Sequence, residues 1–160
     1  MLQTEEFALT ALSLSPVITA ADLPGFARER AERGARVIRP DGPEVRIALG
    51  EDALDRANGG PDVLRRQLEH LRQVAAMPNV RFRVLSRSTT AGIVPALVCP
   101  FTLLEVESKT LAYVESLTRS DYIKASAPYV TAFEQAWNIA ISEDESAAIL
   151  GDRIADRNYS

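Results

Sequence analysis

Apolar residues recur with a helical period most clearly between residues 61 and 76. Leu64, Leu68, Leu71 and Val74 are spaced by three or four residues, so they lie on one face of a helix. Pro61 suits the first helical position, and a Pro-Asn pair after residue 77 ends the pattern. We therefore expect an amphipathic helix in the middle of the chain.

Further helices are predicted towards both ends of the chain. Thr4 can cap a helix whose first turn carries two glutamates, which the helix dipole favours there. Ser142 and Glu145 have the spacing of a capping box, so they open a short last helix. Helical patterns also cover residues 22–38 and 129–140.

Strands are predicted where apolar and polar residues alternate, at residues 44–51 and 80–86. Residues 101–106 and 110–117 predict an antiparallel hairpin. A helix connects the first two strands, so they are expected to be parallel. The predicted fold is α/β (α+β), a single mixed sheet of about four strands packed by helices, in a single domain over residues 1–160.

The predicted core combines the apolar faces of these elements. It contains residues of the central helix, of the second strand and of the helix after the hairpin: Leu64, Leu68, Leu71, Phe82, Phe133 and Trp137. Arg46, Arg81 and Arg83 alternate with the core positions of the first two strands. They either pair with acidic side chains of the helices or bind an anion.

Composition and charge exclude several classes of protein. The net charge is −4, with 10 basic and 12 acidic residues in positions 1–80 and 8 and 10 in positions 81–160. Neither half of the chain carries a net positive charge, so we expect no nucleic-acid binding by this chain alone. No apolar run reaches the length of a membrane span, and the first ten residues lack the basic start of a signal peptide. We expect a cytoplasmic protein.

The residue inventory also limits the chemistry. Cys99 and His70 are the sole cysteine and histidine, which excludes an intrachain disulfide and the usual zinc sites. We therefore predict no metal, and we also predict no cofactor, since no glycine-rich phosphate loop occurs. His70 falls on the polar side of the central helix and is expected to be exposed and inert, with Cys99 in a loop or in the core.

Two features suggest a site. Glu105, Tyr113 and Glu115 lie on the predicted hairpin, where a carboxylate beside a phenol can exchange a proton or hold a polar ligand. Seven of the ten residues in segment 91–100 are Ala, Ile, Val, Leu or Cys. This segment either closes over the core or lines a site for an apolar ligand. The predicted ligand-binding residues are Ile93, Val94, Leu97, Phe101, Tyr113 and Glu115.

Several short motifs occur in the order known from one bacterial family. They are Leu2-Gln3-Thr4-Glu5-Glu6-Phe7-Ala8, Gly59-Gly60-Pro61, Arg66-Gln67-Leu68-Glu69-His70-Leu71, Pro100-Phe101-Thr102-Leu103-Leu104 and Tyr113-Val114-Glu115-Ser116. The chain thereby resembles the C-terminal sensing domain, of unknown biochemical function, of antitoxin-like XRE-type helix-turn-helix regulators of high-GC Gram-positive bacteria. The resemblance implies a cytoplasmic domain that binds a ligand or a small partner protein, and it supplies no catalytic residues.

The sequence departs from that family in three respects. It starts at Met1 without a helix-turn-helix, so the DNA-binding domain is expected to be absent. Gly34 follows Arg33 where the family has glutamine, and residues 93–98 lack the histidine and glycines usual in that loop. The apolar replacement of that loop favours an apolar ligand.

Two functional hypotheses follow. The first is a sensing domain of the regulator type that binds an apolar small molecule or a small partner protein, with homodimer formation left open. The second is a domain recruited as a cofactor-independent cyclase or isomerase that acts on an apolar natural-product intermediate. Tyr113, Glu115 and Glu105 are the catalytic candidates of the second hypothesis.

Overall fold

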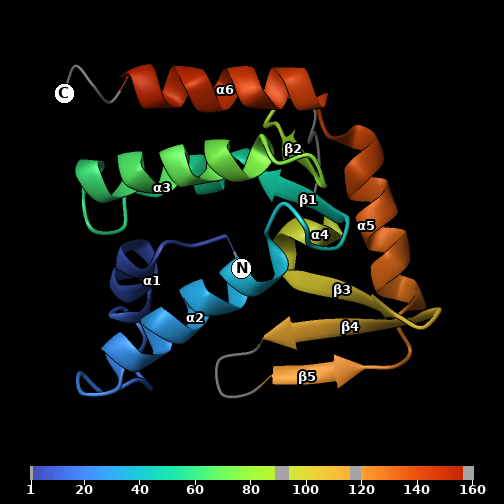
Figure 1. Ribbon diagram of the computed structural model, residues 1–160, viewed down its shortest axis with the longest axis horizontal. Coiled ribbons are helices and arrows are strands. Elements are labelled where there is room, and N and C mark those ends of the chain that lie inside the picture. The colour runs from blue at the N-terminus through green and yellow to red at the C-terminus, as the bar shows by residue number, and fades with distance from the viewer. Residues whose placement is uncertain (1, 89–93, 116–119, 157–160) are drawn as a thin grey trace.

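The computed structural model describes residues 2–88, 94–115 and 120–156 (Figure 1). The element order is α1 (Glu5–Leu12), α2 (Leu23–Val37), β1 (Val45–Gly50), the 3₁₀ turn η1 (Glu51–Leu54), α3 (Pro61–Ala75), β2 (Val80–Leu85), α4 (Pro95–Val98), β3 (Phe101–Val106), β4 (Lys109–Glu115), β5 (Ser120–Ile123), α5 (Ala127–Ile139) and α6 (Glu143–Asp156).

The strands form two separate sheets. In the first sheet, β1 and β2 are parallel, with Ile47 opposite Phe82. In the second sheet, β4 pairs antiparallel with β3 on one side and β5 on the other. The β3–β4 turn uses Glu107 and Ser108 with positive φ angles of 50° and 63°, which matches the type I′ turns of two-residue hairpins.

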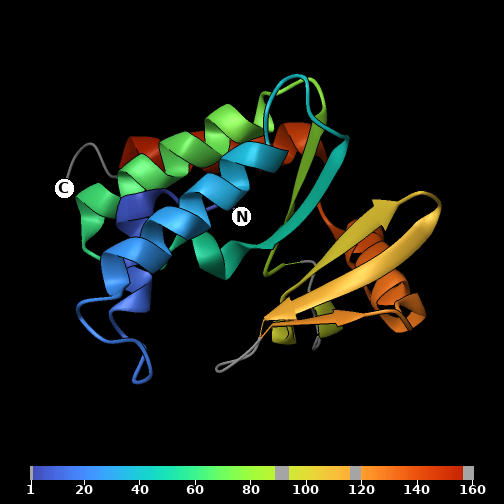
Figure 2. The same ribbon diagram turned by 60° about the horizontal axis from the view of Figure 1, so that its bottom comes forward.

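The prediction of one mixed sheet was therefore wrong, although the parallel pair and the hairpin were predicted correctly. Helix α5 explains the division, because it contacts β1, β2 and β3 and so occupies space beside both sheets. Phe101 of β3 packs edge-on against Tyr129 of α5, with ring centroids 5.2 Å apart. Figure 2 shows the three-stranded sheet standing apart from the parallel pair, with α5 alongside it.

The main core lies between the parallel pair and the helices α3 and α6. Leu64, Leu68, Leu71 and Phe82 belong to this core, as predicted. Phe133 and Trp137 are not among the residues of this cluster. They stack on each other at 5.9 Å, on the side of the parallel pair that carries its arginines.

The side chains of these arginines contact residues of α5 and α6. Arg46 and Arg83 lie over the Trp137 ring, with guanidinium carbons 4.4 Å and 4.5 Å from its centroid. Arg46 forms an ion pair with Glu134 at 2.8 Å, and Arg81 pairs with Glu143 at 2.7 Å. Of the two predicted alternatives, pairing with acidic side chains is therefore the one observed. The cation–π contacts of these arginines also cover the Trp137 indole, which is 6% exposed.

The predicted caps are confirmed. The Thr4 side chain accepts the backbone N–H of Phe7 at 3.2 Å. Ser142 and Glu145 form the reciprocal capping box, in which each backbone N–H donates to the other side chain. Helix α6 continues to Asp156 and is therefore longer than predicted. None of the helices in the described ranges has the length and apolar character needed to cross a membrane.

Candidate functional site

Helix α2 carries a series of unusually small residues. Ala27, Ala31, Gly34 and Ala35 recur at helical spacing, and of the residues in this helix only Ala27 and Gly34 are buried. Ile38, directly after the helix, enters the main core. Small side chains cannot fill the space between two helices, so this spacing leaves room between α2 and α3.

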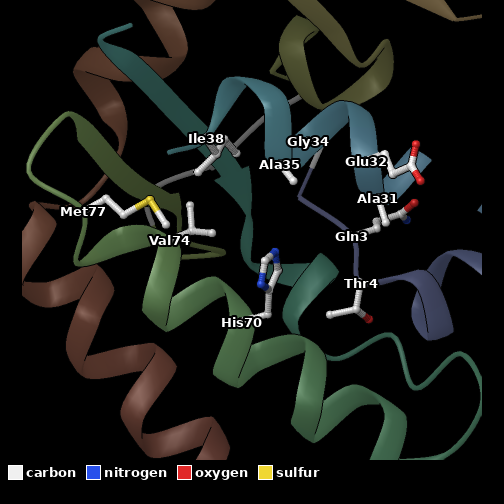
Figure 3. Close-up of a pocket in the computed structure, with 10 residues that line it drawn as sticks. All are labelled: Gln3, Thr4, Ala31, Glu32, Gly34, Ala35, Ile38, His70, Val74 and Met77. Atoms are coloured by element: carbon white, nitrogen blue, oxygen red, sulfur yellow. The ribbon is translucent and has the colours of Figure 1, made fainter. Parts of the chain in front are cut away.

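A cavity of about 350 Å³ occupies that space (Figure 3). Its walls come from the segment before α1, from α2 with the residue after it, and from α3 with the residue two positions after it: Gln3, Thr4, Ala31, Glu32, Gly34, Ala35, Ile38, His70, Val74 and Met77. The wall is mainly apolar, and no lysine or arginine is among these residues. Figure 3 shows the side chains of α2 and α3 approaching each other across it.

The segment before α1 is held in place by a buried side chain of α3. Gln67 is 5% exposed. Its amide oxygen accepts the backbone N–H of Thr4 at 2.8 Å, and its amide nitrogen donates to the carbonyl of Leu2. These two bonds fix Gln3 and Thr4 as a wall of the cavity.

His70 lies at the centre of this site. It is half-buried rather than exposed, so the prediction of an exposed imidazole was wrong. Figure 3 shows the ring pointing from α3 into the space in front of α2. Burial lowers the pKa of His70 below its usual value, and the imidazole is therefore neutral at neutral pH. Residues of α2 line the same cavity as His70, an arrangement that the helical period of α3 alone cannot show.

A second cavity, of about 280 Å³, lies on another side of α2. Apolar side chains of Leu12, Ile18 and Phe26 line it together with Glu29, Arg30, Arg33, Glu115 and Ser120. It is more polar than the first cavity and contains most of the charges that connect α2 to the second sheet.

Tyr113 and Glu115 meet at the edge of this second cavity. Arg33 donates to the Tyr113 hydroxyl at 3.0 Å and to the Glu115 carboxylate at 3.2 Å. The hydroxyl also lies 3.1 Å from Glu115 Oε1 and 3.0 Å from Ser120 Oγ. Partial burial opposes ionisation of Arg33, but Tyr113 and Glu115 beside it raise its pKa, so the guanidinium stays charged.

The structure does not bring the other predicted site residues to this cluster. In the β3–β4 register, Tyr113 is opposite Thr102 and Glu105 is opposite Thr110. Glu105 and Phe101 therefore share the sheet face opposite to that of Tyr113 and Glu115. Glu105 is exposed at that position.

The apolar segment that follows β2 packs elsewhere. Val94 is 6% exposed and joins Leu85 and Ala136 in a small cluster. Leu97 of α4 is 42% exposed and lies beside Gly50, where an added Cβ would be 2.8 Å from it. Ile93 lies outside the described residues, and Cys99 is exposed. No described residue of this segment is among those lining either cavity.

A third group of charges closes the carboxyl end of the parallel pair. Glu51 accepts the backbone N–H of Arg87 at 2.9 Å, the Ser86 hydroxyl at 2.9 Å and an Arg153 N–H at 3.1 Å. These bonds, with the backbone N–H as the strongest influence, lower the pKa of Glu51. The group joins η1, the end of β2 and α6.

Sequence reasoning missed the cavity between α2 and α3, but a signal was present. Ala27, Ala31 and Ala35 lie four residues apart, with Gly34 beside the last. Such a stripe of small residues on a helix otherwise rich in arginine and glutamate indicates a close or unfilled contact. The position of α3 determines whether the contact is close or unfilled, and the sequence does not show that position.

Comparison with known proteins leads to a family. A search of curated proteins and a search of solved structures each find no match. The model of a family described as a domain of unknown function, DUF5753, matches residues 1–152. This match covers nearly the whole chain, including both cavities and the cluster at Tyr113, and the chain therefore belongs to the DUF5753 family.

Proposed function

We propose that this chain is a sensing domain that binds a small, largely apolar molecule in the cavity between α2 and α3. The proposal follows the resemblance to the sensing domains of XRE-type regulators and places the domain in the cytoplasm. The observation that carries it is the mainly apolar cavity of about 350 Å³. Pockets that bind small molecules have volumes from about 300 Å³ upwards and mainly apolar walls with few polar groups.

The position of α2 supports a sensing role. Ala31, Gly34 and Ala35 line the proposed ligand cavity, whereas Arg30 and Arg33 of the same helix contact Glu115 of β4. A ligand that shifts α2 would change both sets of contacts. In the ion pair between Arg33 and Glu115, the two side chains are 41% and 43% exposed, so breaking this pair costs little free energy. Helix α2 is thus suited to transmit binding to the second sheet.

The catalytic alternative has less support. A cyclase or isomerase would use Tyr113 and Glu115, which do meet, but Arg33 already occupies both groups. Glu105 lies on the other face of the sheet and cannot join them. We therefore favour binding without turnover. A small partner protein would have to bind at the molecular surface and not in this cavity.

Cavity-filling substitutions test the proposal. The ligand is unidentified, so we choose naphthalene as a compact apolar probe and measure its binding by fluorescence. Ala31→Leu should place a larger side chain in the cavity and weaken binding about tenfold or more, which is about 1.4 kcal/mol. Ala147→Leu on α6 is the matched control, since Ala147 is exposed and does not line the cavity. It should bind like the wild type.

A third variant separates the two cavities. Glu115→Gln changes the second cavity without touching the first. Binding that is weakened by Glu115→Gln but unaffected by Ala31→Leu would contradict the proposal and place the ligand beside Tyr113. Failure of the wild-type protein to bind naphthalene at all would also contradict it.

A further inference from the structure

We infer that the molecule bound between α2 and α3 is uncharged and carries one hydroxyl, phenol or carbonyl group, and that His70 is the group that recognises it. This inference rests on the proposed function and names the class of ligand. It makes a prediction that the cavity alone does not make, because an apolar cavity without a recognising group would favour a hydrocarbon.

Among the polar side chains that line the cavity, His70 is the one with no hydrogen bond or ion pair to the described part of the chain. Gln3 accepts an N–H of Arg30 at 3.3 Å, and Thr4 accepts the N–H of Phe7 as the cap of α1. Glu32 pairs with Arg36 at 3.6 Å. Within the part of the chain that the structure describes, no hydrogen bond reaches the imidazole of His70. A neutral imidazole has one donor and one acceptor, and Figure 3 shows the ring in the space that the ligand would occupy.

The charges around the cavity select an uncharged ligand. Burial lowers the pKa of His70, so the ring does not offer a positive charge at neutral pH. Glu32 of α2 is the other ionisable residue in the wall, and it is paired with Arg36, while no lysine or arginine lines the cavity. An anionic ligand would lose its hydration without gaining a cationic partner. A hydroxyl, in contrast, can both donate to and accept from the neutral imidazole.

The size of the cavity sets the scale of the ligand. At the roughly 30 Å³ that one water molecule occupies in the liquid, the cavity has room for about a dozen such units. A bicyclic aromatic or a short terpenoid skeleton is of that order. Three probes with the same ring system are therefore suitable: naphthalene, 2-naphthol and 2-naphthoate.

The test measures the dissociation constants of these three probes at neutral pH for the wild type and for His70→Phe. In the wild type, 2-naphthol should bind about fivefold to tenfold more tightly than naphthalene, the gain of one net hydrogen bond, and 2-naphthoate should bind most weakly. His70→Phe should keep the affinity for naphthalene and lose the preference for 2-naphthol. His70→Gln, which retains a donor and an acceptor, should restore part of that preference.

The outcomes separate this inference from the proposed function. If naphthalene binds and Ala31→Leu weakens it, the proposed function stands. The inference is then overturned if 2-naphthoate binds most tightly, or if His70→Phe retains the preference for 2-naphthol. If naphthalene does not bind to the wild type, the proposed function fails and the inference fails with it. Naphthalene binding by His70→Phe shows in the same experiment that the variant is folded.

Discussion

Ser146 shows how a single buried hydroxyl can complete a sheet edge. It is 0% exposed and accepts the backbone N–H of Val84 at 2.9 Å, while its own hydroxyl donates to the carbonyl of Ser142 at 2.7 Å. The edge of β2 away from β1 is thereby satisfied by α6. The N–H of Ile141 adds a bond to the carbonyl of Val84 at 3.0 Å.

Removing this hydroxyl should be costly. Ser146→Ala leaves the buried N–H of Val84 without a partner, so we expect a loss of about 1–3 kcal/mol in the free energy of unfolding. Urea denaturation measures it, with the exposed Ser13→Ala as the matched control, for which we expect a change within about 0.5 kcal/mol. Equal effects of the two substitutions would show that Ser146 does not carry the edge of β2.

His70 should make stability depend on pH near neutrality. Its pKa is about 6.5 in the unfolded chain and lower in the folded protein because of burial. The unfolded state therefore binds more protons as the pH falls through this range, and the free energy of unfolding decreases. The effect is absent above the unfolded pKa, where both states are neutral.

The variant His70→Gln provides the comparison. Between about pH 7.5 and about pH 5.5, its free energy of unfolding should fall less than that of the wild type. Most carboxylates titrate below this window, including Glu51, whose pKa is lowered by its bonds to Arg87 and Ser86. Parallel pH profiles for the two proteins would mean that His70 is as solvated in the folded protein as in the unfolded chain.

At the scale of elements, the sequence predicted those with strong local signals. The leucine series of α3 and the caps of α1 and α6 depend on neighbouring residues, and the structure confirms them. Strand β5 was not predicted, because Ser120–Ile123 has four residues and its pairing with β4 is not local. The one-turn helix α4 within the apolar segment was also missed, because four residues are too few to show a helical period.

The candidate site shows the same division. The meeting of Tyr113 and Glu115 follows from their positions two residues apart on one strand. The contribution of Arg30 and Arg33 does not, because it depends on how α2 crosses β4. The role of His70 as a wall residue was missed because the sequence does not show that residues of α2 and α3 line one cavity.

The link between α2 and β4 should contribute little to stability. The Glu115 side chain is 43% exposed, and its partners Arg30 and Arg33 are 31% and 41% exposed. Solvent screens such pairs, so Glu115→Gln should lower the free energy of unfolding by less than about 1 kcal/mol in urea denaturation. A loss several times larger would mean that this cluster holds the fold together and is unsuited to release α2.

At the scale of the whole molecule, α5 decides the architecture. It contacts the parallel pair and the hairpin at once, and its Trp137 is covered by arginines of the parallel pair. Strands were predicted at residues 44–51 and 80–86 and in the hairpin at 101–106 and 110–117, but these local patterns do not show which helix lies between two sheets. The single mixed sheet was therefore the simpler expectation and was wrong.

The cavity under α2 is the central claim at this scale, and a nuclear magnetic resonance titration of isotope-labelled protein with naphthalene tests it most directly. We predict that the largest shifts of amide signals occur at Ala31, Gly34, Ile38, His70 and Val74, which line the cavity. Largest shifts instead at Phe26, Glu115 and Ser120, which line the second cavity, or no saturable shifts at all, would contradict the account.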